Sequence, residues 1–72
     1  MDGAIKRIEE NKFYILYKRE LPKHDVTPKY VIYRTADFGG DYFDDFYTLT
    51  EARRIFNKAT KEAQECEKII AL

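Results

Sequence analysis

The segment Asp37–Tyr47 constrains the fold more than any other part of this chain. It places the pair Gly39-Gly40 between two aromatic-rich runs, directly ahead of a helix start. Glycines adopt the positive backbone angles that a tight turn requires. The segment therefore predicts an antiparallel hairpin whose second strand, Asp41–Tyr47, leads into a helix.

Two earlier runs also have the composition of β-strands. Phe13–Tyr17 and Tyr30–Thr35 are rich in aromatic and branched side chains and contain no Gly or Pro. Because successive side chains of a strand alternate, both runs carry apolar residues on both faces. The charged residues Lys18–Glu20 are expected to end the first strand, and Leu21–Lys29 is expected to form a loop.

The start of the helix is explicit in the sequence. Thr48-Leu49-Thr50-Glu51 fits a capping box, in which Thr48 is the N-cap and Glu51 reaches back to it. A helix over residues 49–67 is predicted, and residues 68–72 form an apolar tail that either extends it or docks on the core. Apolar residues recur at helical spacing and predict one buried stripe: Leu49, Ala52, Ile55, Phe56, Ala59, Ala63 and Cys66.

These elements predict a single α+β domain. A three-stranded antiparallel sheet over residues 12–48 is followed by one C-terminal helix packed on one face. Residues 1–11 are weakly patterned, and Ile5 and Ile8 fit either a helical turn or a ragged strand. One helix covers only one face of such a sheet, and the sequence leaves open which face. The second, tyrosine-rich face is expected to stay partly open unless the N-terminal segment covers it.

Composition argues against several function classes. The chain has 72 residues with one Cys and one His, so it has neither a disulfide nor a Cys/His metal cluster. It also lacks a Ser/His/Asp set and a glycine-rich phosphate loop, and we expect neither an enzyme nor a cofactor. No apolar run is long enough to cross a membrane, and the start lacks the apolar core of a secretion signal, which predicts a cytosolic protein.

The acidic hairpin is the candidate binding surface. It interleaves aromatic rings with carboxylates, of which Asp41 and Asp45 are expected to project from one strand face. Carboxylates resist burial unless they are paired, so this composition favours a surface covered by a basic partner. The alternatives are solvated aspartates at turns and sheet edges, or a calcium site without EF-hand spacing. The candidate partner-binding residues are Asp37, Asp41, Tyr42, Phe43, Asp44, Asp45, Tyr14 and Tyr33.

Charge balance bears on nucleic-acid binding. The formal net charge is zero, from 13 basic and 13 acidic residues, whereas a general nucleic-acid binder usually carries a basic excess. The basic residues that would contact nucleic acid are Lys12, Lys18, Arg19, Arg34, Arg53 and Arg54.

A homodimer sealed by the open sheet face is a further candidate.

The junction Phe46-Tyr47-Thr48-Leu49-Thr50-Glu51-Ala52-Arg53 resembles the strand-to-helix corner of the AP2-like DNA-binding domains at the N-termini of phage integrases. Those domains are three antiparallel strands followed by one helix, and their corner often reads Phe-x-Thr-x-x-Glu-Ala. The resemblance covers this corner and implies a basic sheet inserted into a DNA groove. Asp41, Asp44 and Asp45 depart from that pattern, because phosphates would repel them.

In general character the chain also resembles small phage-encoded inhibitors, including anti-CRISPR proteins. These are short, cysteine-poor, non-enzymatic proteins that often occupy nucleic-acid sites with acidic surfaces. The sequence therefore predicts a non-catalytic protein-binding module, an inhibitor or adaptor, whose acidic hairpin occupies a basic surface of the nucleic-acid-binding type. The alternative is a DNA-binding domain of the AP2-like type.

Overall fold

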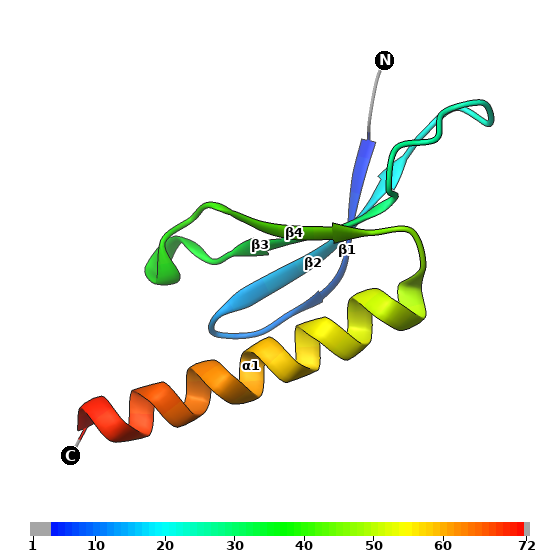
Figure 1. Ribbon diagram of the computed structural model, residues 1–72. Coiled ribbons are helices and arrows are strands. Elements are labelled where there is room, and N and C mark those ends of the chain that lie inside the picture. Colours follow the sequence, from blue (N-terminus) through cyan, green and yellow to red (C-terminus); the bar gives the residue numbers. More distant parts are fainter. Residues whose placement is uncertain (1–3, 72) are drawn as a thin grey trace.

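The computed structural model describes residues 4–71 (Figure 1). The strands form one antiparallel sheet in the order β1-β2-β3-β4, and α1 lies across one face of it. The predicted α+β class and C-terminal helix are confirmed, but the predicted three-stranded sheet is wrong, because the sheet has four strands. The elements are β1 (Ala4–Glu10), β2 (Tyr14–Glu20), β3 (Tyr30–Arg34), the 3₁₀ helix η1 (Ala36–Phe38), β4 (Tyr42–Phe46) and α1 (Leu49–Ala71).

The additional strand, β1, comes from the weakly patterned N-terminal segment. It pairs with β2, with Arg7 opposite Tyr17, and its register shifts between Arg7 and Glu9. Such a bulge interrupts the alternation of a strand. Ile5 and Ile8 therefore lie three apart yet belong to one strand, which is why periodicity did not identify it.

The end of β2 is set by backbone pairing. The charged residues Lys18–Glu20 were expected to end the strand, but β2 continues through them to Glu20. Lys18 lies opposite Lys6 of β1 and opposite Tyr30 of β3, so this part of β2 has a partner strand on each side. Side-chain polarity alone gave too short a strand.

The turn between β3 and β4 contains both predicted glycines. Gly39 and Gly40 have φ angles of 116° and 68°, a region that favours glycine. The connection also contains η1, so it is longer than a two-residue hairpin turn. Thr35 fixes it to the neighbouring strand connection, since its hydroxyl donates a hydrogen bond to the carbonyl of Lys12 at 2.8 Å.

A bulge in β4 changes the predicted arrangement of the aspartates. Tyr42 lies opposite Tyr33, and the register then shifts so that Phe43 is the extra residue. Asp41 precedes the strand, and the bulge interrupts the alternation between it and Asp45. The expectation that these two aspartates share one strand face does not hold.

α1 begins at the predicted capping box. The backbone N–H of Glu51 donates a hydrogen bond to the Thr48 hydroxyl at 3.2 Å, which satisfies one of the free donors of the first turn. Within residues 4–71, this is the half of the box that forms. The helix runs past its predicted end at residue 67, so the apolar tail extends it as far as Ala71.

The hydrophobic core lies between α1 and the sheet face that carries Leu16 and Ile32. The predicted stripe of α1 is confirmed except at Cys66, which is exposed. The described α1 side chains after Ala63 are all exposed, because the helix extends beyond the sheet (Figure 1). The buried members of the core are Phe13, Tyr14, Leu16, Ile32, Phe46, Ala52, Phe56, Ala59 and Ala63.

One polar contact ties the β1–β2 turn to the helix. The Asn11 amide Nδ2 donates to Thr60 Oγ1 at 2.8 Å, and the Thr60 hydroxyl donates to the Phe56 carbonyl at 2.7 Å. The Asn11 side-chain oxygen accepts hydrogen bonds from the backbone N–H groups of Phe13 and Tyr14 at 2.8 and 2.9 Å. A single side chain therefore both shapes the turn and fixes it against α1.

Candidate protein-interaction surface

β4 is an outer strand of the sheet, and the acidic side chains gather along it and on η1. We call the exposed residues Asp37, Asp41, Tyr42 and Asp44 the acidic edge. Asp37 lies in η1, Asp41 in the turn, and the other two in β4. An outer strand also presents backbone N–H and C=O groups that no neighbouring strand pairs, and these can bond to a partner. The edge therefore combines negative charge, an aromatic ring and free backbone groups.

Two of the hairpin aspartates are partly neutralised within the fold. Asp41 Oδ1 lies 3.1 Å from Arg34 Nη1, and Asp45 Oδ2 lies 4.0 Å from Arg19 Nη1. Within residues 4–71, Asp37 and Asp44 make no ion pair. Asp44 instead accepts a hydrogen bond from the backbone N–H of Asp45 at 2.8 Å. The negative charge available to a partner therefore resides mainly on Asp37 and Asp44.

Two of the predicted aromatic partner-binding residues pack on the side of the sheet that α1 covers. Tyr14 is 5% exposed, and its ring centroid is 5.0 Å from that of Phe43 and 6.5 Å from that of Phe56. Burial raises the pKa of the Tyr14 phenol, and this effect is larger than that of the nearby charge of Arg34. Phe43 packs half-buried against the same core. These positions leave Tyr14 almost no surface for a partner.

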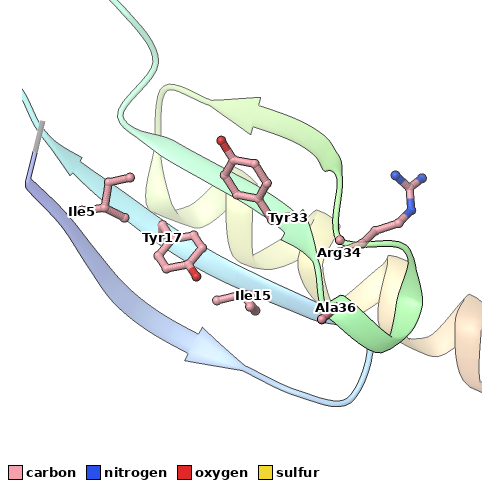
Figure 2. A pocket seen from close by; sticks show the side chains of 7 residues that line it. Ile5, Ile15, Tyr17, Tyr33, Arg34 and Ala36 are labelled. Carbon is pink, nitrogen blue, oxygen red and sulfur yellow. The ribbon is translucent and has the colours of Figure 1, made fainter.

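The opposite side of the sheet has no element packed on it within residues 4–71. Ile5, Ile15, Tyr17, Tyr33 and Tyr42 share this side, which we call the open face; Figure 2 shows the first four of them on the side away from the helix. Its tyrosine rings meet edge-on, with centroids 5.9 Å apart for Tyr17–Tyr33 and 6.1 Å for Tyr33–Tyr42. The rings thus form a row across three strands.

The open face is hollowed beside this row. The hollow has a volume of about 510 Å³ and is shallow, which suits a broad protein surface better than an enclosed small molecule. β1 lies at the edge of the sheet and does not cover the hollow, so within residues 4–71 the tyrosine face stays open, one of the two outcomes that the sequence allowed. The residues that line the hollow are Ile5, Ile15, Tyr17, Tyr33, Arg34, Ala36 and Gly40.

Tyr42 belongs to both the acidic edge and the open face. Its side chain is 48% exposed. The pKa of its phenol is raised, first by partial desolvation and then by the negative charges of Asp45 and Asp44. The ring therefore stays neutral and remains a hydrogen-bond donor at neutral pH.

The basic residues predicted for nucleic-acid contact lie on different surfaces. Lys12 pairs with Glu67 at 2.8 Å, and Arg19 Nη1 donates to the carbonyl of Pro28 at 2.8 Å in addition to its contact with Asp45. The Arg34 guanidinium is held by Asp41 and lies 5.1 Å from the Phe43 ring centroid. The other three do not extend this group: Lys18 lies beside Lys6 on the sheet, whereas Arg53 and Arg54 are exposed on α1.

A second hollow, of about 200 Å³, lies between η1 and α1. Phe38 closes one side, with its ring centroid 5.2 Å from that of Phe13. This hollow could not be predicted from the sequence, because it depends on η1, whose three residues carry no helical periodicity. Its lining includes Cys66, which was predicted to be a core residue. It is lined by Lys12, Phe13, Asp37, Phe38, Ala63, Cys66 and Glu67.

Within residues 4–71 the acidic residues do not form a metal-binding group. In the part of the chain that the structure describes, no three His, Cys, Asp or Glu side chains are arranged to hold a metal ion. Asp41 pairs with Arg34 instead, and Asp45 lies near Arg19. The described arrangement gives no support to the calcium alternative.

Comparisons with known proteins do not assign a family. No protein-family model matches the chain, and neither the search of curated proteins nor that of solved structures returned a significant match. Among residues 4–71, α1 is the one long helix, and it is too polar to cross a bilayer. The interpretation of the surface therefore rests on its own geometry.

Proposed function

We propose that this chain is a non-catalytic protein-binding module, an inhibitor or adaptor, whose acidic edge occupies a basic surface of another protein. The observation that carries the proposal is the position of Asp37 and Asp44. Both are exposed, and neither is in an ion pair within the described residues; Tyr42, which is also exposed, lies on the same outer strand as Asp44.

This arrangement favours a basic protein partner for physical reasons. Complementary charge accelerates encounter and selects among partners, whereas the affinity comes from apolar anchors and desolvated contacts. Tyr42 supplies such an anchor, since tyrosine is enriched among the residues that dominate interface energy. A basic surface of the nucleic-acid-binding type fits best, because it is built to receive rows of negative charge.

The alternative function is a DNA-binding domain of the AP2-like integrase type. The exposure of Arg53 and Arg54 on α1 favours it. The internal pairing of Arg19, Arg34 and Lys12 weighs against it, because these residues would have to exchange their partners for phosphates. Duplex DNA affinity that falls steeply with salt concentration would support this alternative.

The first test uses a charge-reversal pair at the acidic edge. The tagged protein captures partners from bacterial lysate, with and without nuclease, and mass spectrometry identifies them. The double variant Asp37→Lys/Asp44→Lys is expected to weaken binding of a nuclease-resistant partner by roughly 100-fold, because it places like charges in contact. Affinity is then measured with the purified partner by calorimetry.

The matched control reverses two charges elsewhere. Glu62→Lys/Glu65→Lys changes the net charge equally on the exposed surface of α1 and is expected to leave affinity unchanged. Equal loss in both double variants would show a nonspecific charge effect, and unchanged binding in both would eliminate the acidic edge as the contact. Partners that disappear with nuclease would place the DNA-binding alternative first.

A further inference from the structure

The open face carries a row of side chains whose two ends have opposite charge. The strand register places Arg7 opposite Tyr17, Tyr17 opposite Val31, and Val31 opposite Asp45. Residues directly opposite each other in a sheet share a face. The row therefore crosses all four strands as Arg7, Tyr17, Val31 and Asp45, from a cation on β1 to an anion on β4.

A second row lies beside the first. Glu10 is opposite Ile15, Ile15 is opposite Tyr33, and Tyr33 is opposite Tyr42. This row is apolar and aromatic over β2, β3 and β4, and it borders the hollow of the open face (Figure 2). The face thus has an apolar centre between edges that carry charge.

Such a face is complementary to itself. When two sheets pack face to face with a twofold axis parallel to the strands, β1 of one copy lies over β4 of the other. Arg7 of each copy then lies over Asp45 of its partner copy, and Ile15 of each lies over Tyr33. Both ion pairs form in a single arrangement, as an isologous interface requires.

We infer that the open face is an interface between two copies of this chain, formed by sheet-on-sheet packing with Arg7 and Asp45 paired across it. This inference goes beyond the proposed function and uses a different surface, apart from Tyr42, which belongs to both. Sheet-on-sheet packing leaves the outer side of β4 uncovered, so Asp37, Asp41 and Asp44 of the acidic edge stay accessible in the dimer. Failure of either proposal therefore leaves the other standing.

The groups that would pair across the interface are only weakly paired within one copy. Arg7 contacts Glu10 at 2.7 Å, but the two side chains are 62% and 41% exposed, and surface pairs of this kind contribute little. Asp45 is 4.0 Å from Arg19, at the limit of an ion pair. The net charge of zero also means that two copies do not repel each other overall.

The size of the face sets the expected affinity. Strand spacing and rise give it a footprint of about 400 Å² per copy, about half of the 800 Å² typical of a stable interface. The dimer is therefore weak and reversible, with a Kd on the order of 0.1 mM. It forms at high local concentration and dissociates on dilution.

The test exploits the twofold geometry. Sedimentation equilibrium of the full chain is expected to show a monomer–dimer equilibrium near this Kd. Arg7→Asp and Asp45→Arg each place like charges opposite each other twice, so each alone weakens self-association by at least about tenfold. Mixing the two variants restores both pairs, and the mixture is expected to associate within about threefold of the unaltered protein.

Three results would overturn the inference: an unaltered chain that stays monomeric up to about ten times the expected Kd, single variants that still dimerise, or a mixture that associates no better than its components. Thermal unfolding of each variant checks that it is folded. A measurement without substitutions covers the case in which Asp45→Arg fails to fold. In a half-labelled sample, intermolecular NOEs from Ile15 methyls to the Tyr33 ring are expected, and their absence in a dimer would exclude this face.

Discussion

The two faces of the sheet have similar apolar content, but α1 covers one of them and the other remains partly exposed. On the side that α1 covers, Leu16, Ile32 and Phe56 are at most 1% exposed. On the open face Val31 is also 1% exposed, but Ile5 and Tyr42 are 56% and 48% exposed. The covered side is built mainly from side chains without polar atoms, and the open side from tyrosines, whose hydroxyl groups can remain in water. The difference teaches that residue type, rather than apolar content, distinguishes the core face from the open face.

The largest expected effect separates the two faces by stability. Phe56→Ala removes the largest fully buried side chain and is expected to lower the free energy of unfolding by about 3–5 kcal/mol. Tyr33→Ala removes two ring contacts on the open face and is expected to cost about 1 kcal/mol. Urea unfolding measures both. Equal costs would show that the open face contributes to the core of a single copy as much as the covered face does.

A middle-sized effect tests how the covered face is held against α1. Asn11→Ala removes the hydrogen bonds to Thr60 and to two backbone N–H groups and is expected to cost about 2 kcal/mol. Thr60→Val removes the Thr60 contact alone and should cost less. Asn57→Ala is the control, because Asn57 is exposed on α1 and alanine has higher helix propensity. If Asn11→Ala lowers the free energy of unfolding no more than Asn57→Ala does, the Asn11 contacts do not hold the turn against α1.

Local chemistry allowed much of the fold to be predicted from the sequence. The Gly39-Gly40 turn, the Thr48 cap and the stripe around Phe56 each depend on neighbouring residues, and the structure has all three. β1 could not be predicted in the same way, because its bulge hides the alternation and its pairing with β2 depends on residues distant in sequence. For the same reason, the first predicted strand ended before Lys18, whereas β2 continues to Glu20.

The candidate surface shows the same division between local and tertiary information. The sequence placed negative charge and aromatic rings on one hairpin, and four of the eight predicted residues form the acidic edge. It could not show that Arg34 and Arg19 lie close to Asp41 and Asp45, because these contacts join different strands. Nor could it show that the bulge at Phe43 leaves that ring against the core, with Tyr14 buried beneath it.

The smallest expected effect compares two tyrosines, one from each face, through their ionisation. The folded protein raises the pKa of both Tyr14 and Tyr42 above the ordinary value of 10.0, in each case chiefly by desolvation. A raised pKa means that folding favours the neutral phenol. This stabilisation is fully present below pH 10.0 and is lost as the pH rises through the folded-state pKa.

Tyr14 should dominate this loss, because its ring lies in the core whereas that of Tyr42 is half exposed. The fall in Tm between about pH 8 and about pH 11 is therefore expected to be smaller in Tyr14→Phe than in the unaltered chain. Tyr42→Phe should reduce the fall less. If Tyr42→Phe reduces the fall in Tm more than Tyr14→Phe does, the open face is as desolvated in solution as the covered face. A dimer present at the concentration of the experiment would produce this result. Repeating the melts at tenfold dilution separates these cases, since only a dimer-dependent shift disappears on dilution.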